Sequence, residues 1–190
     1  MRILYMLNTL AIGGAERLVL ALGERMDARG HEVQVVTLGP ERSDEWPTWV
    51  DVVRLGMGKS PLRALSGVVK GARALRAFRP HVVHSHNFHG NMLARTLRLT
   101  HRSARLISTL HNEYEGGSVR MLALKLSGPL STHTVAVSHA VAERALQLRI
   151  IRPEKCRVIL NGIDVAALAP DAERRTASRL AMGRAETSSG

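Results

Sequence analysis

The chain has 190 residues, of which 45% are hydrophobic and only 3% are aromatic, and it contains a single cysteine, Cys156. This length suits about one domain with an aliphatic core, and one cysteine excludes an internal disulfide framework. The sequence has neither an apolar run of the roughly 18 residues needed to span a bilayer nor the features of a signal peptide at its start. We therefore expect a cytoplasmic protein.

The charge balance is strongly basic, with 27 lysine and arginine residues against 16 aspartate and glutamate residues, a net charge of +11. Such a charge favours anionic partners, which include a phosphorylated substrate, an acidic membrane surface and nucleic acid. Nucleic acid is disfavoured, because aromatic residues for base stacking are few and no nucleic-acid motif occurs. A peripheral position at the inner face of the membrane is thus a candidate location.

Short aliphatic runs alternate with helical patterns along the chain. Strands are predicted at residues 2–7, 32–38, 51–55, 81–84, 105–109, 133–137 and 157–160, and helices at 14–29, 61–79, 87–100, 117–130 and 138–148. This alternation predicts right-handed crossovers and a parallel sheet covered on both faces. The predicted fold class is α/β, with a Rossmann-like parallel sheet of about seven strands and helices on both faces.

The helix predicted at 61–79 carries both apolar and basic residues. We expect its inward residues to be Leu62, Leu65, Val69 and Ala72, and its largely outward residues to be Arg63, Lys70, Arg73 and Arg76. The basic stripe has two interpretations, a solvated helix face or an electrostatic patch that faces anionic lipid or a phosphorylated acceptor.

Polar residues follow several of the predicted strands. In an open parallel sheet, ligands bind beyond the carboxyl ends of the strands, near the point where the strand order reverses. The candidate site residues at these ends are Gly13, Gly14, His86, Asn87, Thr109, His111, Asn112 and Ser138, with Asn161, Gly162 and Asp164 in a turn after the last strand.

Gly13 and Gly14 stand between the first strand and an amphipathic helix. Without side chains, they would let backbone and the positive end of the helix dipole approach a phosphate or a sugar hydroxyl. The simpler interpretation is that the pair only shapes a tight turn. A nicotinamide cofactor is disfavoured, because no G-x-G-x-x-G follows the first strand.

His84 and His86 lie at the end of the fourth strand, and we expect them to point opposite ways, one packed and one facing the cleft. A zinc site would need further ligands that the sequence does not obviously supply. No D-x-D pair is present to hold a metal diphosphate either. We therefore expect no metal ion.

Five segments, in order, resemble the N-terminal domain of the glycosyltransferase family 4 group. They are GGAER at 13–17, VVHSHN at 82–87, STLHN at 108–112, AVS at 136–138 and VILNGID at 158–164. The resemblance implies the N-terminal half of a GT-B architecture, in which two Rossmann-like domains face each other. It also implies a retaining transfer of sugar from a nucleotide-sugar co-substrate to a hydroxyl acceptor, without metal or other cofactor.

The resemblance also implies roles for single residues. In the family, a histidine at the place of His111 lies by the donor sugar and the acceptor, so His111 is the candidate catalytic residue, able to accept or share a hydroxyl proton. The alternative is a structural loop histidine. Asn161 and Asp164 would brace the turn that leads to the second domain, since Asn-Gly is first of all a turn signal.

The pattern departs from the family after about residue 168. Residues 169–190 resemble the start of a truncated interdomain connection with a disordered tail, and no second sheet follows. We expect 1–168 to form the acceptor-side domain, with the donor-binding domain absent and the chain inactive alone. Two alternatives stay open: a non-catalytic acceptor-binding module or subunit that pairs with a separate C-terminal domain, and a nucleotide enzyme of similar topology.

Overall fold

The computed structural model describes residues 1–10, 13–39, 47, 49–162, 176 and 179. Within them, one parallel sheet has the strand order β3-β2-β1-β4-β5-β6-β7. The strands are β1 (Arg2–Leu7), β2 (Glu32–Thr37), β3 (Asp51–Arg54), β4 (Val82–His86), β5 (Arg105–Leu110), β6 (His133–Ala136) and β7 (Cys156–Val158). The helices are α1 (Gly14–Asp27), α2 (Pro61–Phe78), α3 (Asn87–Arg98), α4 (Ser118–Ser127) and α5 (His139–Gln147), with short 3-10 turns at Gly128–Leu130 and Pro153–Lys155.

The predicted α/β, Rossmann-like fold is confirmed, and every predicted strand and helix is present. The fourth strand runs further than predicted, because Ser85 and His86 continue the ladder by pairing with Ser108 and Thr109 of β5. Polar side chains therefore stand inside the sheet and not only beyond it. The predicted turn residue Asp164 and the predicted tail lie outside the described residues.

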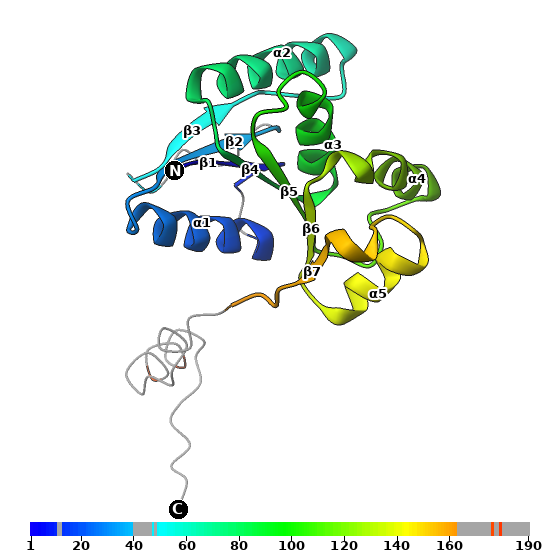
Figure 1. The fold of residues 1–190 in the computed structure, drawn as a ribbon. Coiled ribbons are helices and arrows are strands. Elements are labelled where there is room, and N and C mark those ends of the chain that lie inside the picture. Colours follow the sequence, from blue (N-terminus) through cyan, green and yellow to red (C-terminus); the bar gives the residue numbers. More distant parts are fainter. Residues whose placement is uncertain (11–12, 40–46, 48, 163–175, 177–178, 180–190) are drawn as a thin grey trace, which may run out of the picture.

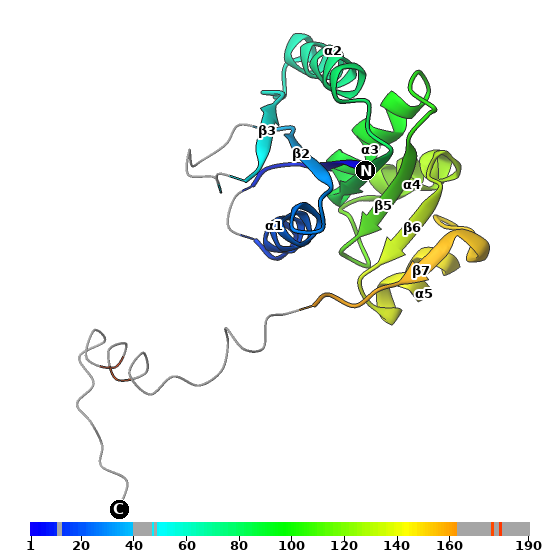
Figure 2. The same cartoon turned by 60° about the vertical axis from the view of Figure 1, so that its left-hand side comes forward.

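Helices lie on both faces of the sheet, but unequally. Figures 1 and 2 show α2, α3, α4 and α5 on one face and α1 on the other. On the α1 face, Val19 of the helix packs with Tyr5 and Leu7 of β1 and with Val35 of β2. None of the helices among the described residues combines the length and apolarity needed to cross a membrane.

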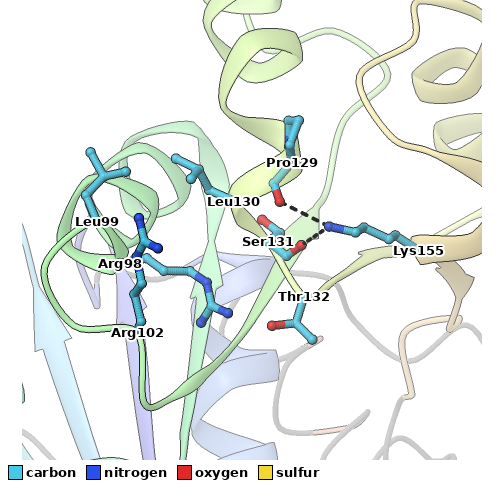
Figure 3. A pocket seen from close by; sticks show the side chains of 8 residues that line it. All are labelled: Arg98, Leu99, Arg102, Pro129, Leu130, Ser131, Thr132 and Lys155. Carbon is cyan, nitrogen blue, oxygen red and sulfur yellow. Dashed lines mark hydrogen bonds between the residues drawn. The ribbon is translucent and has the colours of Figure 1, made fainter.

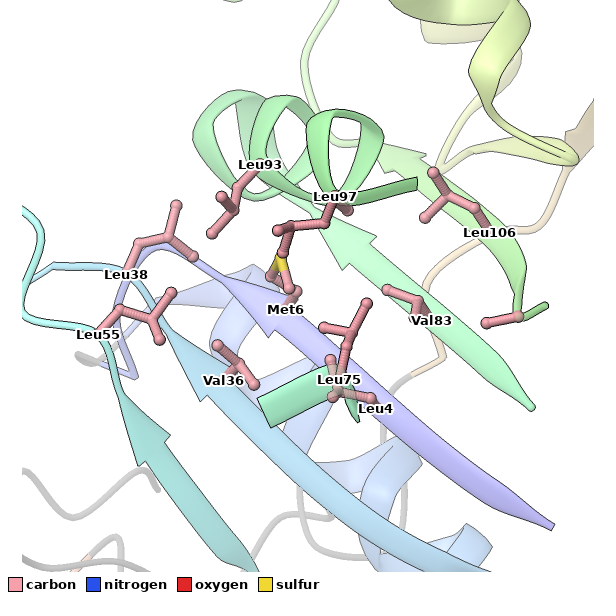
Figure 4. Close-up of a cluster of buried hydrophobic side chains, with 12 residues drawn as sticks. Leu4, Met6, Val36, Leu38, Leu55, Leu75, Val83, Leu93, Leu97 and Leu106 are labelled. Atoms are coloured by element: carbon pink, nitrogen blue, oxygen red, sulfur yellow. The ribbon is translucent and has the colours of Figure 1, made fainter. Parts of the chain in front are cut away.

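The main core lies between the sheet and helices α2 and α3. Leu93 and Leu97 of α3 lie over Met6 of β1, with Leu75 of α2 and Val83 of β4 in the same cluster (Figure 4). Burial of such side chains contributes about 1.5–3 kcal/mol each. This packing fixes the start of α3 directly above the end of β1.

The contact between α3 and β1 depends on a glycine. A Cβ atom on Gly90 would lie 2.8 Å from the backbone oxygen of Met6 and 3.3 Å from Cα of Leu7. Backbone atoms of a central strand cannot move aside as a flexible side chain does, so any side chain here would push α3 off the sheet. Gly90 therefore sets how closely the helix approaches.

A buried arginine ties α3 to the segment around the end of α4. Arg95 is 1% exposed and donates from Nε to Ser131 Oγ (3.1 Å) and from Nη1 to Leu124 O (3.2 Å) and Ser127 Oγ (3.0 Å). Burial lowers the pKa of Arg95 to about 10. Its charge meets the carbonyl end of α4, where a cation is favoured.

The predicted orientation of helix α2 is wrong for three of its apolar residues. Leu62, Leu65 and Val69 are exposed, at 79%, 63% and 43%. The buried positions are instead Gly67, Gly71 and Leu75. The error arose because large apolar residues were taken to mark the core. Here small residues let α2 lie close to α3, because a Cβ atom on Gly71 would come within 3.1 Å of Leu97.

Helix α2 therefore exposes apolar and basic residues together. We name Leu62, Leu65 and Val69 the apolar ridge, since they lie at i, i+3 and i+7 on the exposed side. The exposed cations on the same helix, here named the basic row, are Arg63, Lys70, Arg73 and Arg76. The sequence of α2 contains no acidic residue.

Candidate functional site

The strand order reverses between β1 and β4, which are neighbours in the sheet although two strands separate them in sequence. In such folds the crevice beyond these strand ends is where ligands bind. Helices α1 and α3 both begin at this edge. The candidate site is therefore built from the starts of two helices and the ends of two central strands.

The start of α1 is open. Gly13 precedes the helix in extended conformation (φ −153°, ψ 167°), and no side chain caps the helix start. The first N–H groups of a helix have no acceptor within it. A Cβ atom on Gly14 would meet nothing within 4 Å, and neither glycine has positive φ. A turn conformation thus does not require this glycine pair, whereas space for a ligand beside Gly14 exists.

One acidic side chain lies against this helix start. The carboxylate of Glu16 folds back over Gly13, so closely that a Cβ atom there would collide with Oε2. A negative charge is favoured at the positive end of a helix. An anionic group of a ligand at this place would therefore compete with Glu16.

His84 and His86 point to the same face of the sheet, which corrects the expectation that they point opposite ways. Their ring centroids are 4.2 Å apart, because residues i and i+2 of a strand share a face. Tyr5 of β1 packs beside both rings, at centroid distances of 5.5 and 6.2 Å. The two histidines form a stack on the α1 face of the sheet.

His111 joins this stack at the end of β5. His86 Nδ1 and His111 Nε2 form a hydrogen bond of 3.1 Å, while His84 Nε2 bonds Thr109 Oγ1 at 2.8 Å. Burial lowers the pKa of all three histidines, with a further lowering from the mutual proximity for His84 and His86, and the pKa of His84 falls to about 4. The cluster is therefore neutral near pH 7.

Three other predicted site residues, Thr109, Ser138 and Asn87, have structural roles near this edge of the sheet. Thr109 is 2% exposed, and its hydroxyl is used by His84. Ser138 caps α5, because its Oγ accepts the N–H of Val141 at 3.2 Å. Asn87 begins α3 with φ 59°, a left-handed conformation that asparagine tolerates. All three stay predictions as ligand-binding residues.

The loop after β5 adds a residue that sequence reasoning missed. Asn112 is exposed and hydrogen-bonds Glu115. Burial raises the pKa of Glu115, the hydrogen bond from Asn112 opposes that shift, and Oε1 of Glu115 is buried without a partner among the described residues. The pair Gly116-Gly117, both with positive φ, follows directly and was the signal that could have drawn attention to this loop.

Two cavities open near the candidate residues. A narrow one of about 200 Å³ lies against the histidine stack and is lined by His84, His86, Thr109, Asn161 and Gly162, together with apolar side chains. This cavity brings together residues of β4 and β5 and residues of the segment after β7. The predicted interdomain turn therefore lies beside the histidines.

A wider cavity of about 650 Å³ lies between the ends of β1 and β2 and the starts of α2 and α3. Asn8, Lys59 and His89 are among its polar lining residues. Burial lowers the pKa of His89, and Arg120 nearby lowers it further. Sequence reasoning missed Lys59 and His89, because neither directly follows a strand.

A third cavity, of about 440 Å³, lies at the opposite edge of the sheet and is lined by Arg98, Arg102 and Lys155 (Figure 3). Lys155 Nζ donates to the carbonyls of Pro129 (3.0 Å) and Ser131 (2.9 Å), and Arg98 donates to another backbone carbonyl. Lys155 and Arg98 thus bind backbone carbonyl groups of the fold. We do not include this cavity in the candidate site.

Among the described residues, no group of three or more histidine, cysteine or acidic side chains is placed to hold a metal ion. Within the histidine stack, His86 bonds His111 and His84 bonds Thr109. The expectation of a metal-independent site stays a prediction.

A Rossmann-like sheet with its polar residues at the switch point is the architecture of one half of a GT-B glycosyltransferase. The sequence profile of Glycosyltransferase Family 4 matches residues 12–167, and the chain belongs to that family. No protein with a curated description matches the chain.

Solved structures share the fold at low sequence identity. HepE from Anabaena in complex with UDP and glucose has a TM-score of 0.73 at 18% identity, over 96% of this chain and 50% of that chain. A glycosyltransferase from Rickettsia africae has a TM-score of 0.72 at 16% identity, over 98% and 50%. Sucrose-phosphate synthase from Thermosynechococcus elongatus has a TM-score of 0.71 at 18% identity, over 94% and 52%. The chain therefore spans about half the length of these enzymes.

Proposed function

We propose that this chain is the acceptor-side, N-terminal half of a retaining glycosyltransferase that moves a sugar from a nucleotide-sugar to a hydroxyl acceptor. Membership of Glycosyltransferase Family 4 supports the reaction class, and HepE, which shares the fold, was crystallised with UDP-glucose. The observation that carries the proposal is the switch point, where the uncapped helix start at Gly14 and the bonded pair His86–His111 occupy one edge of the sheet.

The donor and the acceptor would meet at this edge. The diphosphate of the donor suits the open start of α1, since uncapped N–H groups and the helix dipole favour an anion. The acceptor suits the 650 Å³ cavity, where Lys59 and Asn8 offer a charge and an amide. His111 would contact the sugar or the reacting hydroxyl. No metal or other cofactor is needed in this scheme.

The partner domain would supply the rest of the donor site. Stabilisation of the leaving diphosphate is the largest electrostatic requirement of such a transfer, and one open helix start meets it only in part. The isolated chain would then bind an acceptor without turnover. A cytoplasmic location is part of this proposal.

The exposed side of α2 would hold the protein against an anionic membrane. The apolar ridge and the basic row lie on the same helix, and no acidic residue of α2 opposes them. An amphipathic helix of this composition binds in the interface of a membrane that contains anionic lipids. The start of α2 also lines the wide cavity through Ala64, so a membrane-borne acceptor would be near the site.

A second candidate function is a non-catalytic acceptor-binding module that pairs with a separate C-terminal domain. The chain spans about half the length of its structural relatives, which is compatible with either function. The two functions share a site and differ in whether the donor half is covalently attached.

The test joins a donor-binding domain of a family member after residue 168 and measures acceptor-dependent release of nucleoside diphosphate. The joined protein is expected to turn over, and the chain alone is not. Restored activity on mixing the two halves as separate chains would favour the second function. Steady acceptor-dependent release by the chain alone would contradict the need for a donor half.

Substitution in the joined protein tests the site itself. His111→Ala should lower kcat about 100-fold, the scale of a lost proton-transfer or hydrogen-bonding group at a reacting centre. His101→Ala is the matched control, because His101 lines a cavity at the opposite edge of the sheet. Equal activity of the two variants would remove His111 from the reaction.

A further inference from the structure

One buried ring nitrogen of the histidine stack has no hydrogen-bond partner among the described residues. His86 is fully buried, at 0% exposure, and its Nδ1 bonds His111 Nε2 at 3.1 Å. The other ring nitrogen, Nε2, is buried and makes no hydrogen bond among the described residues. His111 is half-buried, and the structure shows no hydrogen bond from its Nδ1 within the described part of the chain. One hydrogen bond thus joins the fully buried ring of His86 to the partly exposed ring of His111.

Two arrangements of protons are compatible with this bond. In the first, His86 carries its proton on Nδ1 and donates to a bare Nε2 of His111. In the second, His111 donates from Nε2, and the proton of His86 lies on its buried Nε2. Each neutral ring carries one proton, so the choice for one ring fixes the other.

The unpartnered atom decides between the two arrangements. The second arrangement buries an N–H group that has no acceptor, while the first leaves only a bare nitrogen there. Buried N–H groups without an acceptor are rarer in proteins than acceptors that lack a donor. The stacked ring of His84 makes no hydrogen bond with His86 Nε2, although the two ring centroids are 4.2 Å apart. The first arrangement is therefore favoured.

We propose that His86 is a positioning residue that holds His111 as the Nδ1–H tautomer, so that His111 presents a hydrogen-bond donor to an oxygen atom of the ligand. A sugar hydroxyl or a phosphate oxygen is an acceptor of that kind. His111 would then not remove a proton from the acceptor hydroxyl, because its only basic nitrogen is engaged by His86. The identity of the ligand rests on the proposed function, but the tautomer does not.

The neutral state of the cluster supports this assignment. Protonation of His111 would place a proton on Nε2, so the bond would persist only if the proton of His86 moved to its buried Nε2, where it has no acceptor. A second proton on His86 would be buried without an acceptor, beside the His84 ring 4.2 Å away. The hydrogen bond between His86 and His111 and the burial of both rings therefore both favour the neutral form of the two histidines.

The test reads the tautomers directly. Long-range ¹H–¹⁵N correlation spectra of the uniformly ¹⁵N-labelled chain at pH 7.5 distinguish a protonated ring nitrogen from a bare one in each histidine. The expected result is Nδ1–H with bare Nε2 for His111, and Nδ1–H for His86. A spectrum that shows Nε2–H for His111 would overturn the proposal.

Two variants separate positioning from simple packing. His86→Asn keeps an amide N–H near the place of Nδ1, so His111 should stay in the Nδ1–H form. His86→Leu removes the donor, and His111 should lose its single tautomer and show a mixture. Backbone amide spectra check that each variant is folded, and His101 serves as the internal reference. If His86→Leu is folded and His111 keeps the pure Nδ1–H form, His86 does not set the tautomer.

The ligand is tested separately. UDP-glucose is added to the protein joined to a donor-binding domain, and the Nδ1 resonance of His111 is followed. A shift of this resonance, with the proton still on Nδ1, supports the role of His111 as a hydrogen-bond donor to the ligand. Absence of any shift while the tautomer stands as expected would count against the proposed function and leave the role of His86 intact.

Discussion

Helix α2 gives the prediction with the most measurable magnitude, which is salt-dependent binding to anionic vesicles. The ridge residues Leu62, Leu65 and Val69 are exposed at 79%, 63% and 43%. Full burial of such a side chain contributes about 1.5–3 kcal/mol, so insertion of these exposed fractions should contribute about 4 kcal/mol. Each cation near an anionic surface adds about 1 kcal/mol, which gives about 4 kcal/mol for the basic row.

The two contributions are removed separately. Glutamate at all four positions of the basic row should weaken binding at least 1000-fold, because about 1.4 kcal/mol corresponds to tenfold. Glutamine at the three ridge positions should weaken it by a similar factor and keep the salt dependence. The matched control reverses four exposed cations elsewhere, which changes net charge equally; they are Lys125, Arg144, Arg152 and Arg157.

Co-sedimentation with phosphatidylglycerol vesicles, with phosphatidylcholine as reference, measures this affinity at 0.05 and 0.5 M salt. At 0.5 M salt the Debye length is about 4 Å, so the electrostatic part should largely vanish. If the basic-row variant is folded and binds as the control does, α2 is only a solvated face. Binding that ignores salt in the unmodified chain would refute the electrostatic reasoning altogether.

Three further predictions follow from the core and the site. Gly90→Val should lower the free energy of unfolding by about 1–3 kcal/mol in urea titrations, because its Cβ atom would collide with the Met6 carbonyl; unchanged stability would show that α3 can shift. Stability should fall as pH drops from 6.5 towards 4, by up to about 3 kcal/mol from His84 alone, since its folded pKa of about 4 lies below the unfolded value and the unfolded chain takes up the proton first; His84→Gln should reduce the fall of the urea midpoint between pH 7 and 5, with the remainder left by His86 and His111, and an unchanged fall would show that His84 does not contribute. Gly14→Val should leave the circular dichroism spectrum and melting temperature nearly unchanged and abolish transfer in the joined protein, because its side chain would fill open space beside the helix start; near-normal turnover would show that no ligand occupies this space.

The order of elements could be predicted from sequence because each strand here is a short aliphatic run between helical patterns. The facing of α2 could not be predicted in the same way. Gly67 and Gly71 carry no hydrophobic signal, yet they form the buried side because close approach to Met57 and to α3 matters more than side-chain size. Periodicity alone leaves two possible stripes on such a helix, and only the neighbouring side chains decide between them.

The candidate site was predictable as a set of strand ends but not as a network. Position in the chain indicated His86 and His111, since both close strands that reach the same edge. It could not indicate that the rings of His86 and His111 bond each other, or that the hydroxyl of Thr109 bonds His84. Glu115 and Lys59 escaped notice because loops bring them to the edge, and loop paths depend on the packed structure.

The order of strands also determines how the sheet ends. Its outer members are β3, with four residues, and β7, with three. Each carries exposed charged side chains, Asp51 and Arg54 on β3 and Arg157 on β7. Short, charged outer strands oppose the addition of a strand from another molecule and so protect against aggregation. Extension of this sheet by a strand from another molecule is therefore disfavoured at both of its sides.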